Sequence, residues 1–253
     1  MVKQKYYEIG SIVKVFKIIE ILVTESEFEV RELCKLSELP KTTVHRMLLT
    51  LQDLGYVSQN PKKRLYRATT KFFELGQSIM RNSSIIDIAH PHMIDVAMEA
   101  GESVNLAILD GLDAVCIDKV EGQNPLKVDL PIGSRYPAYF SGYGKANLAF
   151  MSEKERADLL KDIIIVPPTD KSLKTVKAIE KDLEKVRSQG YALDNEEGMI
   201  GIRCIAAPIF NHNKDVVAGI SIAMPVSRFG KKKIPDMAKI VMKAAVKISE
   251  ELG

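Results

Sequence analysis

Apolar residues recur at helical spacing in three runs within the first 55 positions of the chain. Residues at i, i+3, i+4 and i+7 lie on one side of an α-helix, so each run predicts a helix with one buried face. Ser11 is a candidate N-cap for the first helix, Pro40 suits the start of the third, and Gly55 can end it. The positions expected to face inward are Ile12, Val15, Phe16, Ile19, Leu22 and Val23 in the first helix, Val30, Leu33 and Cys34 in the second, and Val44, Met47, Leu48, Leu51 and Leu54 in the third.

A β-hairpin is predicted directly after these helices. Tyr56-Val57 begins an extended segment, Asn60-Pro61-Lys62-Lys63 is rich in turn-forming residues, and Leu65–Ala68 returns as a second strand. Three helices followed by a hairpin predict a small N-terminal domain over residues 1–70. A further helical stretch predicts a linker helix over residues 71–83.

The pattern changes near residue 84 to short strands grouped between helices. The expected strands are Val104–Leu109 and Ala114–Val120 around an Asp110-Gly111 turn, Leu126–Leu130, and a hairpin of Ile205–Phe210 and Val216–Met224. The expected helices cover residues 86–100, a stretch after Gly144, residues 173–189, and a last apolar stripe from Ile234 to Leu252. This order predicts an α+β domain with an antiparallel sheet over residues 84–253.

Composition limits the environment of the protein. The 253 residues suffice for one small and one medium domain. The N-terminus lacks the apolar run of a secretory signal, and no stretch reaches the roughly 18 apolar residues of a membrane span. Three widely spaced cysteines suit reduced thiols and a cytoplasmic location. Because no C-x-x-C or H-x-x-x-H pattern occurs, we expect neither a metal site nor a cofactor.

Charge is distributed unevenly along the chain. Residues 1–83 hold 14 Lys and Arg against 9 Asp and Glu, whereas the remainder holds 22 against 24. A basic first domain and a mildly acidic second one are typical of a protein whose first domain alone meets a polyanion.

Polar and basic residues gather where a helix-turn-helix protein reads DNA. The second helix of such a pair places the polar side chains of its N-terminal half in the major groove, and a hairpin tip can touch the neighbouring backbone. Arg and Lys bind phosphates or guanine edges, and threonine hydroxyls bind phosphates or base edges. Each feature alone is typical of a solvated helix start or turn, but together they predict contact with double-stranded operator DNA. The predicted DNA contacts are Lys41, Thr42, Thr43, His45 and Arg46 on the third helix and Lys62, Lys63 and Arg64 at the hairpin tip.

Several sequence motifs resemble one regulator family. The run L-P-K-T-T-V-H-R-M-L at 39–48 and L-x-x-L-G-Y-V at 51–57 are similar to the winged helix-turn-helix of IclR-family regulators. G-E-S-V-N-L-A-I-L-D-G at 101–111, D-K-V-E at 118–121, G-Y-G-K-A at 142–146, G-Y-A-L-D at 190–194 and G-I-R-C-I-A-A-P-I-F at 201–210 resemble that family's effector domain, in the family's order. The resemblance implies a GAF-like sheet whose pocket binds a small metabolite, often a carboxylate, in a homodimeric or homotetrameric regulator.

Carried over by motif, the implied effector-binding residues are Gly142, Tyr143, Asp194, Cys204, Ser221 and Ala223. Backbone N–H groups near a helix start suit an anionic oxygen, and the serine offers a hydroxyl. Each position also has a structural reading, as a tight turn, a cap or plain core packing. Two residues depart from the family pattern: Tyr143 replaces a small residue, and Ala223 replaces a frequent serine. A carboxylate, a sugar acid and an aromatic compound therefore all stay open as effectors.

Two other functions compete with regulation. A cysteine enzyme would need Cys204 as nucleophile with His90, His92 or His212 as base, but no nucleophile–base motif accompanies them. A winged helix can also bind other proteins, in which case the basic face would be incidental. We expect a DNA-binding transcription regulator with no catalytic residues. Repression is the first expectation, and activation stays open.

Overall fold

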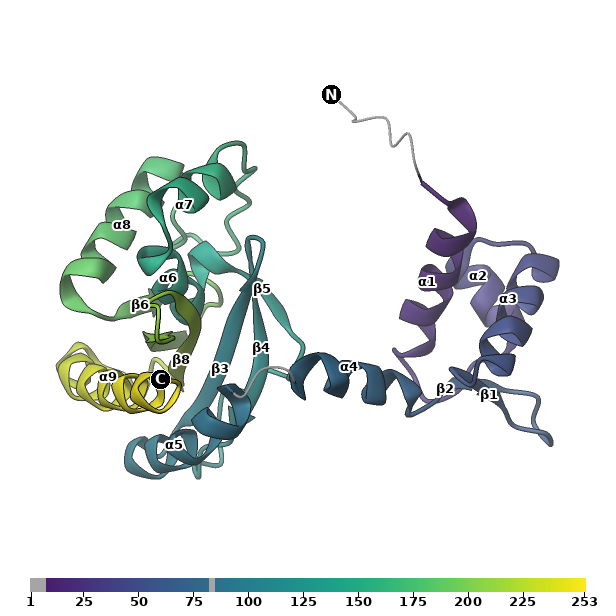
Figure 1. Ribbon diagram of the computed structural model, residues 1–253, viewed down its shortest axis with the longest axis horizontal. Coiled ribbons are helices and arrows are strands. Elements are labelled where there is room, and N and C mark those ends of the chain that lie inside the picture. The colour runs from purple at the N-terminus through teal and green to yellow at the C-terminus, as the bar shows by residue number, and fades with distance from the viewer. Residues whose placement is uncertain (1–7, 82–84) are drawn as a thin grey trace. The chain divides into compact units, whose positions relative to one another are not determined.

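The computed structural model describes residues 8–81 and 85–253. The chain divides into two compact units, residues 1–82 and 83–253, which are treated separately below (Figure 1).

The first unit is a three-helix cluster flanked by a two-stranded hairpin and followed by a fourth helix (Figure 1). Its elements are α1 (Gly10–Leu22), α2 (Val30–Ser37), α3 (Lys41–Asp53), β1 (Val57–Gln59), β2 (Tyr66–Ala68) and α4 (Lys71–Arg81). A capping box starts α2, because Glu29 and Glu32 exchange side chain–backbone hydrogen bonds there. Backbone hydrogen bonds between Phe28 and Tyr66 tie the α1–α2 connection to the hairpin, so the hairpin and the helices share one core.

The buried face of α1 differs from the predicted one. Leu22 is buried as predicted, and Ile18, outside the predicted set, is buried as well, whereas Ile12, Phe16 and Val23 are exposed. The prediction that Ser11 caps α1 is also wrong, because Ile9 occupies the N-cap position. The first helix carries apolar residues on both sides, and periodicity alone could not decide which side the neighbouring helices cover.

The second unit is a six-stranded antiparallel sheet with helices on both faces. Its strands are β3 (Ser103–Asp110), β4 (Asp113–Val120), β5 (Arg135–Pro137), β6 (Ala192–Asn195), β7 (Ile202–Phe210) and β8 (Val216–Pro225). They are ordered β5-β4-β3-β8-β7-β6, and every neighbouring pair is antiparallel. The helices are α5 (Ile85–Ala100), α6 (Gly142–Phe150), α7 (Glu153–Leu160), α8 (Val176–Gln189) and α9 (Ile234–Glu251), with short 3₁₀ turns at Ala138–Phe140 and Lys231–Lys233.

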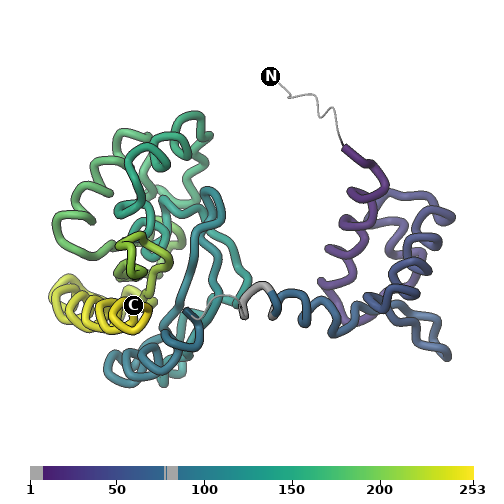
Figure 2. Tube along the Cα trace, in the orientation of Figure 1, coloured from purple at the N-terminus to yellow at the C-terminus, as the bar shows by residue number. Residues whose placement is uncertain are grey.

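Side chains alternate between two cores on the two faces of this sheet. Helices α5 and α9 pack together on one face, against strand residues such as Leu106, Ile205 and Ile220 (Figure 2). Helices α6 and α8 cover the other face, where the strands contribute smaller residues such as Cys204 and Ala206. Small side chains on the α6 face allow the helix to approach the sheet closely.

The segment Leu126–Leu130 forms no strand, contrary to the prediction. Val128 and Leu130 are buried, whereas Leu126 is exposed, although all three would lie on one face of a strand. The edge of β4 is instead paired with residues 133–137, which include β5. Strand β6 and helix α7 were not expected from the sequence. Among the described residues, no helix is both long and apolar enough to cross a membrane.

Candidate DNA-binding surface and effector cavity

A tight turn joins α2 to α3. Glu38 takes a left-handed backbone conformation with φ of 58°, and Pro40 occupies the N-cap position of α3. The backbone N–H groups of Thr43 and Val44 donate to the carbonyl oxygen of Pro40, which closes the first turn of the helix. This sequence therefore forms the helix-turn-helix pair that the pattern predicts.

Helix α3 has a buried side and a polar side. Val44, Leu48 and Leu51 are buried against the other helices. All five residues predicted on its polar side lie there: Lys41, Thr42, His45 and Arg46 are exposed, and Thr43 is half-buried. Leu54, predicted to face inward, is exposed instead.

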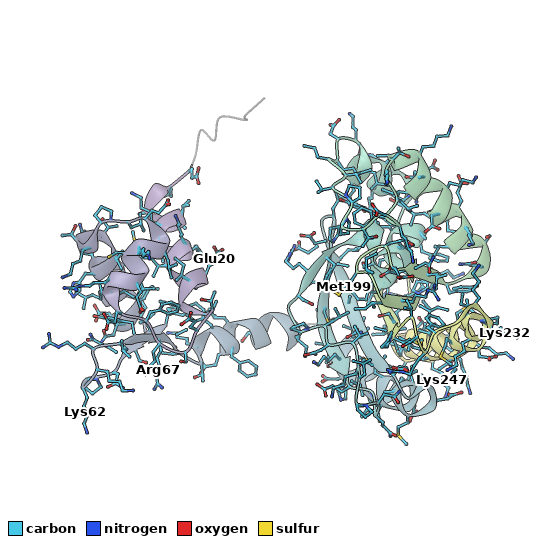
Figure 3. All side chains as sticks on the ribbon, turned by 180° about the vertical axis from the view of Figure 1, so that it is seen from behind. Glu20, Lys62, Arg67, Met199, Lys232 and Lys247 are labelled. Atoms are coloured by element: carbon cyan, nitrogen blue, oxygen red, sulfur yellow. The ribbon has the colours of Figure 1, made fainter. Side chains whose placement is uncertain are left out.

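The hairpin tip carries the second basic group. The side-chain oxygen of Asn60 accepts hydrogen bonds from the backbone N–H groups of Lys62 and Lys63, which fixes the turn. Lys62, Lys63 and Arg64 are all exposed, and Lys62 extends from the end of the hairpin (Figure 3). Lysine and arginine side chains at this tip can pair with backbone phosphates.

A cavity of about 200 Å³ lies beside the N-terminus of α6 in the second unit. Four of the six predicted effector residues line it: Gly142, Tyr143, Asp194 and Cys204. Ser221 and Ala223 are fully buried on β8, directly opposite Ala206 and Cys204 on β7, and do not line the cavity. Contact of these two residues with an effector therefore stays a prediction.

The start of α6 supplies hydrogen-bond donors to this cavity. The Ser141 hydroxyl accepts from the backbone N–H of Gly144 and caps the helix. The first N–H groups of a helix have no partner within it, so those of Gly142 and Tyr143 are available to an anionic oxygen. A Cβ atom added at Gly142 would lie 3.3 Å from the Cys204 Cβ, because the helix start lies directly on β7.

Among the described residues that line the cavity, Asp194 is the one carboxylic acid, and it is buried. Its Oδ1 accepts hydrogen bonds from the backbone N–H groups of Glu197, at 2.7 Å, and Gly198, at 3.4 Å. Burial raises the pKa of Asp194 to about 7, with Lys145 opposing the rise and Glu197 adding to it. Asp194 thus changes charge near neutral pH.

Lys145 holds the segment that contains Asp194. Its fully buried ammonium group donates to Glu197 Oε1 at 2.7 Å, Asp182 Oδ2 at 2.9 Å and the Leu193 carbonyl oxygen at 2.7 Å. Burial alone would lower the pKa of Lys145, but the charges of Glu197 and Asp182 keep it above its usual value. The network joins α6, α8 and the end of β6 around the cavity.

Tyr143 explains part of the cavity's shape. It is buried, and burial raises the pKa of its hydroxyl. A Cβ atom added at Gly219 would lie 2.7 Å from the Tyr143 carbonyl oxygen, so glycine is required there for the helix to reach β8. Tyr143 therefore occupies space on the α6 face that a small residue would leave to a ligand.

Sequence reasoning missed a set of buried polar side chains between β3, β8 and α6. Asn105 on β3 is paired with Ser221 on β8, and neither the amide of Asn105 nor the hydroxyl of Ser221 has a hydrogen-bond partner among the described residues. Asn147 on α6 likewise has an unpaired side-chain oxygen, although its nitrogen donates to Ala107. A buried polar group without a partner costs about 1–3 kcal/mol of stability, so the native fold retains these side chains at a cost. A single asparagine at an inward position of an apolar strand was the available signal.

The histidines lie apart from Cys204. His90 Nδ1 is 2.6 Å from Asp118 Oδ2, His92 Nε2 is 2.8 Å from Glu251 Oε1, and His212 lies in the turn between β7 and β8. Burial raises the pKa of the Cys204 thiol well above its usual value, which disfavours a nucleophilic thiolate. Within residues 8–81 and 85–253, no group of three His, Cys, Asp or Glu residues is placed to hold a metal ion.

Comparison with known proteins identifies both units. Residues 11–61 match the IclR helix-turn-helix domain, and residues 77–250 match the bacterial transcriptional regulator IclR C-terminal domain. The HTH-type transcriptional regulator KdgR of Escherichia coli is 34% identical over 245 residues, covering 97% of this chain and 93% of that protein. The transcriptional repressor IclR of the same organism is 32% identical over 249 residues, covering 97% and 91%. The crystal structure of the Thermotoga maritima IclR superposes with a TM-score of 0.84 at 33% identity, covering 97% of this chain and all of that one.

These relatives are transcription regulators rather than enzymes, and the chain described here belongs to the IclR family of bacterial transcription regulators.

Proposed function

We propose that this regulator binds double-stranded operator DNA through α3 and the β1–β2 hairpin, and that it acts as a cytoplasmic repressor whose DNA affinity changes when a small organic molecule binds the second unit. One observation carries the DNA assignment: the polar side of α3 exposes Lys41, Thr42, His45 and Arg46 directly after the helix-turn-helix turn. These side chains can contact both the phosphates and the base edges of a DNA duplex.

A homo-oligomer fits an exposed apolar stripe on α1. Ile9, Ile12, Val13, Phe16 and Val23 are between 46% and 61% exposed, and their spacing places them on one side of the helix, opposite the buried Ile18. Apolar stripes of this kind typically mark interaction surfaces. A second copy packed there would present two recognition helices to the two half-sites of an operator.

The cavity favours an aromatic monocarboxylate over a sugar acid. Most of its wall is apolar, and Asp194 is the only charged residue among the described residues that line it. A sugar acid would leave several hydroxyls unpaired against that wall, at about 1–3 kcal/mol each. A dry cavity of about 150 Å³ accepts benzene, so about 200 Å³ suffices for one ring with a small substituent. The carboxylate would then face the N–H groups of Gly142 and Tyr143.

The operator assignment is tested by selecting bound sequences from a random duplex library with the full chain. We expect one sequence class to be enriched, and we expect Arg46→Ala and Lys41→Ala to weaken binding to it without lowering the melting temperature. Lys232→Ala, an exposed lysine of the second unit, is the matched control (Figure 3). If no sequence is enriched, or if both α3 variants bind like the control, the recognition-helix assignment is wrong.

The effector class is tested by thermal shift with benzoate, 4-hydroxybenzoate, D-gluconate and pyruvate. The two aromatic acids should raise the melting temperature more than the other two. A larger shift with D-gluconate would retain ligand sensing but reject the aromatic class. No shift with any of the four would reject the class as well.

A further inference from the structure

A groove of about 410 Å³ separates part of α1 from part of α3. Its floor is apolar, formed by Val15 and Met47, and both residues are half-buried. Its rim is polar, with Ser11 and Lys14 on α1 facing Arg46 on α3. The groove belongs wholly to the first unit and is distinct from the effector cavity.

The residues that line the groove follow the helical spacing of α1 on one side and of α3 on the other. Ser11, Lys14 and Val15 stand at i, i+3 and i+4 and share one side of α1. On α3 the corresponding set is Thr43, Arg46, Met47 and Thr50, which flanks the DNA-facing side rather than its centre. Arg46 therefore belongs both to the groove rim and to the predicted recognition surface.

The chemistry of the rim fits an anion. Two cationic side chains and three hydroxyls, those of Ser11, Thr43 and Thr50, line the groove, and no carboxylate is among the described residues that line it. The Thr50 hydroxyl donates to the Arg46 carbonyl oxygen, which leaves the hydroxyls of Ser11 and Thr43 as donors to an anion. An exposed lysine is usually just solvated. Lys17, one turn further along α1, has an acidic neighbour, with its Nζ 3.8 Å from Glu38 Oε2. Lys14 makes no such pair within the described residues, and it shares its groove with a second cation.

We propose that this groove binds a phosphate group of the operator backbone beside the major groove that α3 occupies, with Lys14 and Ser11 as DNA contacts. The inference rests on the proposed operator binding and extends it from α3 and the hairpin to α1. A lysine and an arginine from two helices hold one phosphate from two directions, and hydroxyl groups complete its hydrogen bonds. Such a contact fixes the position of α3 on the duplex without reading sequence.

The test is the salt dependence of binding to a fluorescein-labelled 30-base-pair duplex of random sequence, measured by anisotropy with the full chain. Each phosphate contact contributes about one unit to the slope of log affinity against log salt concentration. We expect Lys14→Ala to weaken binding several-fold at low salt and to reduce the magnitude of that slope by about one. Lys14→Arg should retain the parent's slope. Ser11→Ala should weaken binding with the slope unchanged.

The control separates this site from a general loss of positive charge. Lys232→Ala removes the same charge from the second unit and should leave the slope unchanged. If Lys14→Ala matches Lys232→Ala in affinity and slope while Arg46→Ala binds weakly, the groove does not bind phosphate and operator binding through α3 stands. If the parent fails to bind the duplex even at low salt, both the proposed function and this inference are rejected.

Discussion

Asp194 on β6 and Cys204 on β7 occupy directly opposed positions in the antiparallel sheet, and both line the candidate effector cavity. Burial is the main reason that the pKa of each group lies above its usual value, and Asp194 raises the pKa of the Cys204 thiol further through its charge and a hydrogen bond. At pH 7 the thiol is therefore neutral and Asp194 is about half ionised, so the charge of this wall changes across neutral pH. We expect that change to affect the binding of an anionic effector.

Binding of a carboxylate should depend on pH through Asp194. Since burial raises the pKa of Asp194 to about 7, the protonated carboxyl below pH 7 can donate a hydrogen bond to the ligand, whereas the ionised form above pH 7 repels it. Lys145 and Glu197 face the same group, and their opposite charges partly offset each other. We expect the affinity for benzoate to fall by about tenfold from pH 6 to pH 8.

Calorimetry at the two pH values measures this change. Asp194→Asn, which cannot ionise, should bind benzoate with nearly the same affinity at both. An equally steep dependence in that variant would assign the titration to another group.

Removal of Lys145 should destabilise the second unit strongly. Lys145→Met leaves Glu197 and Asp182 without their shared cation, and breaking a buried ion pair in this way costs about 3–5 kcal/mol. Chemical denaturation measures the free energy of unfolding. Adding Glu197→Gln to the variant should recover part of the loss, since it removes an uncompensated buried charge. If the double variant is less stable than Lys145→Met alone, the charge explanation is wrong.

Replacement of Asn105 should stabilise the fold. Both polar atoms of its amide are buried without a partner, and removing such a group relieves about 1–3 kcal/mol of desolvation cost. Asn105→Leu, similar in size, should therefore raise the free energy of unfolding. Asn124→Leu is the contrasting control, because that amide donates to Gly101 and Glu102 and should lower stability when removed. Destabilisation by Asn105→Leu would instead indicate that ordered water already pairs the amide.

Self-association should depend on the exposed stripe of α1. Phe16 is 58% exposed at the centre of that stripe, and a charge there would oppose the burial of the stripe against a second copy. Phe16→Glu should shift the mass measured by analytical ultracentrifugation towards smaller species, while the melting temperature of the chain changes little. Glu20→Gln, on the same helix, is the control (Figure 3). An unchanged mass for Phe16→Glu would place the oligomer contact elsewhere.

Local signals predicted most of the fold. Apolar periodicity, glycines at helix ends and turns, and the change of period near residue 84 located most of the helices and the central strands β3, β4, β7 and β8. The sequence did not predict the short strand β6. This strand has four residues, and its place at the edge of the sheet depends on its pairing with β7. The strand predicted over Leu126–Leu130 was wrong for the same reason, because a local run of apolar residues does not specify a partner strand.

The residues of the candidate sites also differ in how far local sequence predicts them. The polar side of α3 follows from helical periodicity, so Arg46 and its neighbours could be placed without a structure. Asp194 and Cys204 are ten residues apart in sequence, and only their strand pairing brings them to one wall. Lys145 gave no signal at all, because a lysine on a helix is ordinarily solvated and its burial depends on Glu197 and Asp182 from other elements.

The close approach of Tyr143 to Gly219 gives these two positions different freedom to change during evolution. Any side chain at position 219 would collide with the main chain of α6, so that position is closed to substitution while the helix keeps its place. The atoms nearest to an added Cβ are the carbonyl oxygen, Cα and Cβ of Tyr143, so this contact does not depend on the rest of that side chain. Exchange of the residue at 143, which lines the cavity, would therefore alter the cavity wall, whereas position 219 stays glycine.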